Sequence, residues 1–481
     1  MHHRRMIKKI IKSENKAFII CFIVTIILLS IPLIIRFTAE EPLIIGDKPY
    51  YHMRIAKNLI DYDPLSYMGR TYVFDPYNNF LSFGYGLFGN IFFIVLPFIL
   101  GIVSVIIFFF IIKKLKLNLS IRFLIMLTLI LSPIFVYTFT VLNKHSLIIF
   151  IMLLGFLFFI NKSKLLNYFS IIIFCIIPFL NILASLITIL LILSYTLFKK
   201  RKALSYVTLI LIALITILFN LFIYLKYGFP EKVTFISLNY LQNFISDLGS
   251  IAGSAFFNII LTIVGIIVTW KYKKKIWLIY ITILILLVTL SYYVYSNIYL
   301  KFIITTFTGI GFYKIISMRW KLKFIRDLSI LIMVLGIIFS TTSHTNRLIK
   351  SLPDKNTKQS LEYLKLNSGE KEIILSHYTR GHWIEYYAER AVVMDSLFTY
   401  APKPNEKYRD INAIFYGVDL QDTKRLLDKY QIRYIYIDNE MKQGLVWTKE
   451  KQGLLFLFRN EETFNQIYEE QGIEIWEYIT S

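Results

Sequence analysis

The chain has 481 residues, of which 56% are hydrophobic and 17% aromatic, and its mean hydropathy is +0.59. This apolar share exceeds the roughly 45–50% that is usual in soluble globular domains, so the composition excludes a soluble protein. The net charge of +22 comes from basic residues in short clusters between apolar runs, which is typical of the cytoplasmic loops of a membrane protein and argues against a nucleic-acid partner.

The first apolar segment, residues 17–37, is about 20 residues long and therefore long enough to cross a bilayer. No small-residue cleavage site follows it, so we expect a retained membrane span rather than a signal peptide. The basic leader that precedes it predicts a cytoplasmic N-terminus. Cys21 and Cys175 both lie in apolar segments and indicate no disulfide framework.

Hydropathy predicts about eleven membrane-spanning helices. They cover approximately residues 17–37, 86–113, 121–140, 146–161, 165–181, 183–198, 203–225, 251–270, 276–296, 300–318 and 327–343. With the N-terminus inside, every connection on the cytoplasmic side carries lysine or arginine, as the positive-inside rule requires. The sequence thus predicts a polytopic α-helical membrane domain over residues 1–343.

The same count places the other polar segments outside, including a loop over residues 38–85 and the tail over residues 344–481. Within the tail, β-rich runs such as residues 372–375 and 434–437 alternate with helical stretches. We therefore predict an external α/β domain over residues 344–481. No internal repeat supports a transporter built from repeated halves.

The polar stretch after the first span, residues 46–54, holds the first chemical candidate. Asp47 lies where that span leaves the bilayer, and it is a candidate for catalysis or metal binding; the alternatives are a solvated acid or a helix cap. The apolar residues that follow have helical spacing and predict a helix along the membrane surface. Tyr51, His52 and Arg54 are then either binding residues or the interfacial side of that helix.

Three more ionisable residues lie at predicted outer ends of helices. His145 directly precedes the fourth span, Asp247 precedes the eighth, and Lys301 lies at the outer end of the tenth. Without a function, His145 would be an interfacial imidazole, Asp247 a helix N-cap and Lys301 a snorkelling cation. The positive charge of Lys301 is also suited to binding a phosphate.

The tail contains a glycine loop directly after a predicted strand, in residues 376–386. Arg380, Gly381 and His382 lie in this loop, which is a usual place for ligand binding on an α/β domain. Its aromatic residues are equally consistent with packing against the membrane face.

In their order along the chain, these segments resemble the catalytic subunit of oligosaccharyltransferase and, more broadly, the polytopic GT-C glycosyltransferases that use polyprenyl-phosphate-linked sugars. Asp47 to Arg54 is similar to the family's first external acid and the Tyr-His-x-Arg-like cluster that follows it, and Ser132-Pro133 with the turn to His145 is similar to the segment of the second acidic motif. Ile245-Ser246-Asp247 is similar to the end of the family's Thr-Ile-x-Glu loop. Lys301-Phe302 is placed like the Arg-Phe pair that binds the lipid phosphate. The resemblance extends over nearly the whole chain, tail included.

This resemblance implies a multi-pass glycosyltransferase of the plasma membrane, in the cell envelope, with its C-terminal domain external. It would transfer a sugar or oligosaccharide from a polyprenyl-phosphate-linked donor, a membrane lipid, to a protein or glycan acceptor on the external face. The implied catalytic residues are Asp47 and Asp247. The implied ligands of a divalent Mn or Mg ion are Asp47, His145 and Asp247. The implied substrate-binding residues are Tyr51, His52, Arg54, Lys301, Arg380, Gly381 and His382.

Two motifs depart from the family pattern. Asn143-Lys144-His145 stands where an acid-x-acid pair would hold the metal, which disfavours a hard cation because such ions prefer carboxylates, although His145 suits Mn or Zn. Residues 377–381 read His-Tyr-Thr-Arg-Gly where Trp-Trp-Asp-Tyr-Gly would recognise the hydroxyl residue of an Asn-x-Ser/Thr acceptor. Transfer to protein asparagine is therefore less well supported than the lipid-linked donor.

Two alternative functions remain open. One is a protein N-glycosylating oligosaccharyltransferase proper. The other is a lipid or polysaccharide exporter or a non-catalytic membrane protein, which requires a polar path that the nearly uncharged span interiors do not offer.

Overall fold

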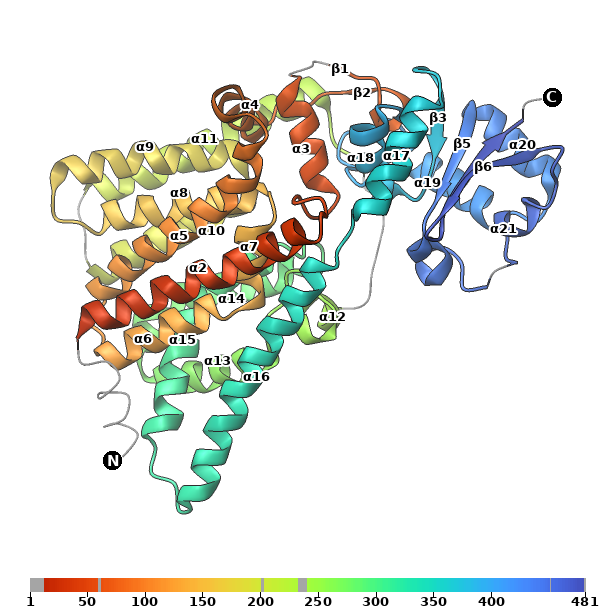
Figure 1. The fold of residues 1–481 in the computed structure, drawn as a ribbon. Helices are drawn as coiled ribbons and strands as arrows, with labels where there is room; N and C mark the ends of the chain where they lie inside the picture. Colours follow the sequence, from red (N-terminus) through yellow and green to blue (C-terminus); the bar gives the residue numbers. More distant parts are fainter. Residues whose placement is uncertain (1–12, 59–61, 200–202, 232–239, 450, 480–481) are drawn as a thin grey trace. The chain divides into compact units, whose positions relative to one another are not determined.

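The computed structural model describes residues 13–58, 62–199, 203–231, 240–449 and 451–479. The chain divides into two compact units (Figure 1). The first consists of the described residues within Met1–Arg36, Phe93–Phe222 and Ile236–Lys350, and the second of those within Phe37–Phe92, Ile223–Phe235 and Ser351–Ser481. Both units are therefore built from segments that are distant in the sequence.

Long apolar helices make up most of the first unit. Five of those described are long and apolar enough to cross a membrane: α2 (Glu14–Thr38), α5 (Ile91–Lys114), α11 (Ala203–Tyr227), α15 (Ser296–Ser317) and α16 (Lys323–Ile349). A sixth span results if α6 (Leu119–Ile130) and α7 (Pro133–Thr140) are taken together, although they are bent by 59°. The bend follows from the sequence, because Ser132 caps α7 by accepting a hydrogen bond from the Phe135 amide, and Pro133 has no amide proton for a continuous helix. The chain is an integral membrane protein.

Shorter apolar helices occupy the other predicted segments. They are α8 (Lys144–Phe159), α9 (Lys164–Leu180), α10 (Ile182–Lys199), α13 (Phe256–Thr269) and α14 (Lys273–Thr289), and the short α12 (Tyr240–Phe244) precedes α13. Each of the eleven predicted apolar segments thus contains helix. Since only five or six of the described helices meet the length and composition of a span, the count of eleven spans stays a prediction, as does the cytoplasmic N-terminus.

Helices α13 and α15 pack closely through small residues. A Cβ atom at Gly265 would lie 1.9 Å from the Phe307 carbonyl oxygen, and one at Gly311 would lie 2.0 Å from the Leu261 carbonyl oxygen. Only glycine permits backbones to approach this closely in the apolar interior of a membrane domain. Thr262 and Thr308 share a hydrogen bond of 2.7 Å across the same interface. This contact fixes α15, the helix that carries Lys301.

A five-stranded sheet forms the centre of the second unit, in the order β4-β3-β5-β7-β6. Its strands are β3 (Ile373–Leu375), β4 (Ala391–Val392), β5 (Ile432–Ile437), β6 (Phe464–Glu470) and β7 (Ile473–Tyr478). Strand β3 is parallel to β4 and β5, whereas β7 is antiparallel to β5 and β6. Gln471 and Gly472 have φ of 52° and 80°, so they form the two-residue turn with positive φ that joins antiparallel neighbours most tightly.

Helices flank this sheet, and a two-stranded hairpin belongs to the same unit (Figure 1). The helices around the sheet are α17 (Lys355–Leu366), α18 (Gly381–Trp383), α19 (Pro404–Tyr416), α20 (Leu420–Lys429) and α21 (Leu454–Leu457), and the hairpin pairs β1 (Tyr62–Asp63) with β2 (Arg70–Thr71). The unit also contains α3 (Lys48–Lys57), which contacts α18, and α4 (Pro76–Phe88), which contacts α3. A π-helical turn over Ile384–Ala388 continues α18.

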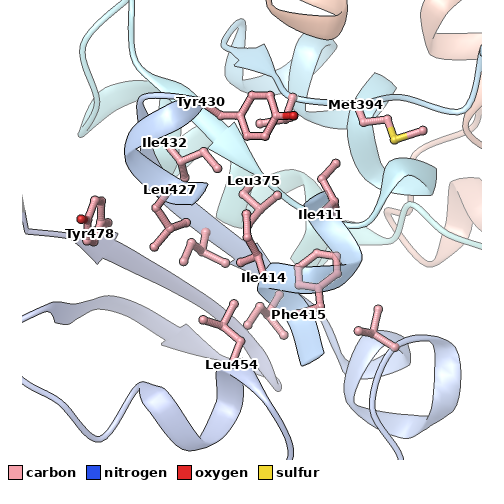
Figure 2. Packing of buried hydrophobic residues seen from close by; sticks show 14 of the residues in the cluster. Leu375, Met394, Ile411, Ile414, Phe415, Leu427, Tyr430, Ile432, Leu454 and Tyr478 are labelled. Atoms are coloured by element: carbon pink, nitrogen blue, oxygen red, sulfur yellow. The ribbon is translucent and has the colours of Figure 1, made fainter. Parts of the chain in front are cut away.

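The side chains of β3 and β5 alternate between two apolar cores, as the period of two in a strand requires. Leu375 and Ile435 join one core, together with residues of α19, α20 and α21 such as Ile414 (Figure 2). Ile374 and Tyr434 face the opposite core, which contains Leu361 and Leu364 of α17. This arrangement gives strands that are buried on both faces.

The segment between the first two long helices contributes to both cores. Tyr67 is 1% exposed in the first core and Tyr50 is 1% exposed in the second. The loop predicted over residues 38–85 therefore packs as part of the same unit as the tail. The predicted division into a membrane domain over residues 1–343 and an external domain over residues 344–481 stays a prediction.

Leu375→Ala is expected to lower the free energy of unfolding by about 2–5 kcal/mol, because Leu375 is fully buried and its truncation leaves a cavity. Leu366→Ala is the matched control, since Leu366 is 84% exposed and its truncation should cost no more than about 0.5 kcal/mol. Thermal unfolding of the purified full chain in detergent, followed by intrinsic fluorescence, measures both. Equal melting temperatures for the two variants would contradict the core described above.

Candidate functional site

Asp47 precedes the first turn of α3, but its carboxylate does not cap the helix. One oxygen, Oδ2, instead accepts a hydrogen bond from the Ser396 hydroxyl. The other, Oδ1, is inaccessible to solvent and has no hydrogen-bond partner among the described residues. The alternative of a simple helix cap is therefore not what the structure shows, and Asp47 keeps a buried acceptor oxygen for another group.

Arg54 lies two turns further along α3 and joins two buried carboxylates. Its Nη1 and Nη2 atoms donate to the two oxygens of Asp63, at 2.7 and 2.6 Å, and Nη2 also donates to Glu385 Oε2 at 2.8 Å. Asp63 is 1% exposed and Glu385 is fully buried. The two-pronged contact with Asp63 is the geometry that a planar guanidinium favours. Arg54, predicted to bind substrate, thus holds the hairpin and the π-helical turn in place.

His382, Glu385 and Asp395 form a fully buried cluster. His382 Nδ1 lies 2.9 Å from Glu385 Oε2, and His382 Nε2 lies 3.6 Å from Asp395 Oδ1. One ligand atom from each residue lies within 4.8 Å of the others. Tyr51 packs against the His382 ring, with 5.2 Å between ring centroids. An imidazole and two carboxylates at this spacing suit a divalent cation.

Asp395 is fixed by neighbours on every side. Its Oδ1 accepts a 2.7 Å hydrogen bond from the Leu397 amide, and its Oδ2 accepts one from the Ser66 hydroxyl. The guanidinium of Arg70 lies 3.9 Å from Oδ1. The rotamer of this carboxylate is thus set before any ligand arrives.

Gly381 is needed because the chain around Asp395 passes very close to it. A Cβ atom at Gly381 would lie 2.7 Å from Asp395 Cβ and 2.8 Å from the Met394 carbonyl oxygen. Any larger residue would push α18 away and separate His382 from Asp395. Within the described contacts Gly381 is a positioning residue, and the substrate contact expected of it stays a prediction.

Charge is concentrated in this part of the second unit. The buried carboxylates of Asp63, Glu385 and Asp395 interact electrostatically with the guanidinium groups of Arg54 and Arg70. The Asp47 carboxylate interacts with His382, Asp395 and Glu385. Burial raises the pKa of Asp47 to about 6, against the opposing effects of His382 and Ser396. Burial also raises the pKa of Glu385.

The imidazole of His382 responds in the opposite direction from an ordinary buried histidine. Burial alone would lower its pKa, but the carboxylates of Asp395, Asp47 and Glu385 raise the pKa of His382 to about 9. For Asp395, burial is outweighed by His382, Arg70 and Ser66, which lower its pKa. Without another cation the cluster therefore favours a protonated imidazole at neutral pH.

Two other predicted binding residues, His52 in α3 and Arg380 just before α18, have different partners. His52 Nδ1 is 2.7 Å from Asn78 Oδ1. Arg380 donates from Nε to Asp438 and from Nη2 to Glu440, both at 2.6 Å. Their roles in substrate binding stay predictions.

The remaining predicted residues belong to the first unit. His145 is buried, with Nδ1 2.8 Å from the Tyr299 hydroxyl and Nε2 3.1 Å from the Tyr293 hydroxyl. Asp247 Oδ2 accepts a 2.9 Å hydrogen bond from the Phe256 amide at the start of α13. The metal-binding role of His145 and the catalytic and metal-binding roles of Asp247 stay predictions.

Lys301 differs from these residues because its charge has no hydrogen-bonding partner. It is fully buried in α15, and its Nζ atom forms no hydrogen bond within the described part of the chain. A snorkelling lysine would extend its ammonium group to water, so that alternative is not observed. A buried, unpaired ammonium is costly unless an anion accompanies it.

Comparison with protein-family models and with curated proteins finds no match. Solved structures, in contrast, match nearly the whole chain. The apo oligosaccharyltransferase of Archaeoglobus fulgidus has a TM-score of 0.63 at 13% identity, covering 98% of this chain and 74% of its own. The arabinofuranosyltransferase AftD of mycobacteria has a TM-score of 0.59 at 13% identity, covering 96% of this chain and 40% of its own. Apo ArnT of Cupriavidus metallidurans has a TM-score of 0.56 at 8% identity, covering 96% and 98%.

All three are GT-C glycosyltransferases. The chain has a GT-C fold of the oligosaccharyltransferase-like type. At these identities the comparison establishes the fold. Other solved structures of the same proteins contain ligands: the Archaeoglobus enzyme with zinc and sulfate, or with an inhibitory peptide and a dolichol-phosphate, and ArnT with undecaprenyl phosphate.

The sequence analysis of this GT-C-like chain missed several residues around the cluster, namely Asp63, Ser66, Arg70, Glu385, Asp395 and Ser396. Two of them carry a detectable signal. Asp395 comes directly after the apolar run from residue 391 to 394, where ligand-binding residues of a parallel sheet are found. Glu385 follows His382 by three residues, a spacing that puts both on one side of a helical turn. The others are brought in by tertiary contacts.

Arg54→Met in this GT-C-like chain should lower the free energy of unfolding by about 3–5 kcal/mol, because it leaves the buried carboxylates of Asp63 and Glu385 without their cation. Arg425→Met is the matched control: its ion pair with Asp422 is 76% and 72% exposed, so its loss should cost at most about 1 kcal/mol. Denaturant unfolding of both variants measures the difference. A change of less than 1 kcal/mol for Arg54→Met would contradict the bridging role.

Proposed function

We propose that this chain is a glycosyltransferase of the plasma membrane that transfers a sugar or oligosaccharide from a polyprenyl-phosphate-linked donor to an acceptor on the external face. The observation that carries the proposal is the GT-C fold, shared over 96–98% of the chain with three glycosyltransferases. Two of these proteins have been solved with a polyprenyl phosphate, which supports the same donor class here.

Lys301 supports the choice of donor. Its ammonium is fully buried and forms no hydrogen bond with any described residue, so an anionic ligand would offset the cost of its burial. The phosphate of a membrane lipid is such an anion, and its charge increases when the bond to the sugar breaks. A fixed cation beside a departing phosphate lowers the barrier without reorganisation during the reaction.

Asp47 is proposed to act on the acceptor. The acceptor nucleophile attacks the anomeric carbon, and the bond from that carbon to the phosphate oxygen breaks, leaving its electron pair on the lipid phosphate. The acceptor proton passes to a base, for which Oδ1 of Asp47 is suited because it is an acceptor without an assigned hydrogen bond. A single displacement of this kind inverts the anomeric configuration.

Asp247, the second predicted catalytic acid, has a weaker case. Its Oδ2 already accepts a hydrogen bond from the α13 backbone. The complex of the Archaeoglobus enzyme with zinc and sulfate supports a divalent cation for this chain as well. Such an ion, when bound, supplies positive charge that lowers the cost of an anionic leaving group.

The acceptor is proposed to differ from an Asn-x-Ser/Thr peptide. In residues 377–381, Arg380 is engaged with Asp438 and Glu440, and His377 Nδ1 lies 2.8 Å from Thr379 Oγ1. The side chains of His377, Thr379 and Arg380 are thus already engaged within the unit. This favours a glycan, or another hydroxyl acceptor, over a peptide that needs the missing aromatic-acid motif.

Asp47→Asn should reduce sugar release from a polyprenyl-phosphate donor about 10²–10⁴-fold, the range for loss of a general base. The assay presents the full-length chain in nanodiscs with a panel of polyprenyl-phosphate- and polyprenyl-pyrophosphate-linked sugars, with and without an Asn-x-Thr peptide. Glu40→Gln is the control, because Glu40 lies on the same segment but its side chain is 75% exposed in a surface ion pair. Unchanged turnover in Asp47→Asn would exclude it as the base, and no release by the unaltered chain from any donor would contradict the proposed function.

Lys301→Met should weaken binding of undecaprenyl phosphate by at least about tenfold, since an anion in a buried site loses its counter-ion. The same change should leave thermal stability equal or higher, because it removes an unpaired buried charge. Lys301→Arg keeps the charge and should retain more affinity. Lys314→Met, at the other end of α15, controls for general loss of basic charge. Equal affinity for the Lys301→Met variant and the unaltered chain would remove Lys301 from the donor site.

A further inference from the structure

We propose that His382 and Asp395, with Glu385 and Asp47 beside them, form a binding site for one divalent cation within the second unit. The ligand class, one imidazole nitrogen with carboxylate oxygens, fits Mn²⁺ or Zn²⁺ better than Mg²⁺, which prefers oxygen ligands alone. This inference stands independently of the proposed glycosyl transfer, because it rests on the geometry and charge of these four residues.

The first observation is a pair of ligand atoms facing each other without a hydrogen bond. His382 Nε2 lies 3.6 Å from Asp395 Oδ1, which is too long for a hydrogen bond, and Nε2 has no other hydrogen-bond partner in the described chain. Two atoms that bind one tetrahedral ion at about 2.1 Å are about 3.4 Å apart. The observed separation therefore matches two ligands of a shared ion.

The second observation is the way His382 is held from behind. Its Nδ1 lies 2.9 Å from Glu385 Oε2, and the same oxygen accepts a hydrogen bond from Arg54. With Nδ1–H donated to Glu385, the lone pair of a neutral imidazole is on Nε2, directed at Asp395. A carboxylate that orients the far nitrogen of a histidine is the usual support of a metal ligand.

The third observation is the presence of further oxygens without partners. Glu385 Oε1 and Asp47 Oδ1 are both inaccessible, and neither has a hydrogen bond from any residue that the structure describes. The Asp47 carboxylate also interacts electrostatically with His382, Asp395 and Glu385. Buried carboxylate oxygens are rarely left unsatisfied, so Glu385 Oε1 is the available source of a third ligand, and Asp47 adds negative charge beside the site.

The charges around the cluster favour a cation. Four carboxylates, those of Asp47, Asp63, Glu385 and Asp395, lie in this region with three cationic groups, those of Arg54, Arg70 and Lys407. The Lys407 ammonium donates a hydrogen bond to the Tyr67 carbonyl oxygen and acts on Asp395 electrostatically. Negative charge is therefore in excess when the imidazole is neutral, and a bound cation offsets it.

This set differs from the metal ligands expected from the resemblance. It replaces Asp47, His145 and Asp247 with residues of the C-terminal part of the chain. Asn143-Lys144-His145 lacks the family's acid pair, and both ring nitrogens of His145 lie beside tyrosine hydroxyls. His382 and Asp395 offer a nitrogen and an oxygen ligand that the altered motif does not.

The test is direct binding of the metal to the purified full-length chain. The protein in detergent is stripped with a chelator and titrated with MnCl₂, with free Mn²⁺ followed by electron paramagnetic resonance, and separately with ZnCl₂ by calorimetry. We expect one ion per chain. His382→Ala and Asp395→Asn should each reduce affinity at least 100-fold. Glu385→Gln, which weakens the support of His382 and replaces one candidate ligand oxygen, should reduce it about 10–100-fold.

Glu474→Gln is the matched control, because Glu474 is a carboxylate of the same unit that is engaged with Lys442 and Trp476 outside the cluster. The Glu474→Gln variant should bind the metal ion with the same affinity as the unaltered chain. If the cluster variants fail to fold, the unaltered chain still decides the matter: added Mn²⁺ or Zn²⁺ should raise its melting temperature and the chelator should reverse the rise.

Absence of stoichiometric binding, or equal binding by His382→Ala, would overturn the site. Sugar release is measured separately on the same preparations. Sugar transfer without metal binding would support the glycosyltransferase proposal and overturn the metal site. Metal binding without sugar transfer would support the metal site and contradict the glycosyltransferase proposal.

Discussion

The second unit depends on the guanidinium of Arg54, which joins a carboxylate 9 residues away, that of Asp63, to one 331 residues away, that of Glu385. Removing either carboxylate or the guanidinium would leave a buried charge unpaired, and that cost makes the three side chains interdependent. Weaker links act alongside them: the Trp383 indole donates to the Gly46 carbonyl oxygen at 3.0 Å, and the Tyr387 hydroxyl donates to that of Tyr50 at 3.0 Å. The polar segment after the first span and the C-terminal part of the chain are consequently one folded body.

That dependence explains why so much charge can be buried in one place. Each carboxylate of the cluster is supported by a different neighbour: Asp47 by Ser396, Asp395 by Ser66 and a backbone amide, and Glu385 by Arg54 and His382. Rigid support of this kind holds side chains in the geometry that a ligand needs and reduces the entropy lost on binding. Gly381 makes the close approach possible, because any side chain there would displace α18 from Asp395.

The membrane helices follow a different constraint, since their side chains meet lipid or each other and every backbone group must be satisfied internally. Glycine and threonine let α13 and α15 approach closely, and Ser132 with Pro133 bends the chain between α6 and α7. Against this apolar background Lys301 is exceptional, because it is buried and its ammonium lacks a hydrogen-bond partner in the described structure. Charge without compensation in a membrane domain is the kind of feature that function retains.

The sequence by itself determined the class of the protein. Apolar runs long enough to span a bilayer indicate helices in lipid, and the basic clusters between them indicate cytoplasmic loops. Both signals are local in the sequence and can be recognised without knowledge of the fold. All eleven predicted segments accordingly contain helix. The order of polar segments also led to the GT-C fold. Asp47 was found as a candidate for the same reason, because an acid at the end of an apolar run is visible in the linear pattern.

Only the tertiary structure decided which residues surround Asp47. Ser396, His382, Glu385 and Asp395 lie more than 300 residues further along the chain, and no periodicity or spacing relates them to Asp47. The pairing of strands and the space left by Gly381 bring them together, and these depend on packing between distant segments rather than on local preference. Packing between distant segments also pairs Arg380, predicted from the sequence to bind substrate, with Asp438 and Glu440. Likewise, Lys301 could be recognised as a cation without a hydrogen-bond partner among the described residues only once its surroundings were known.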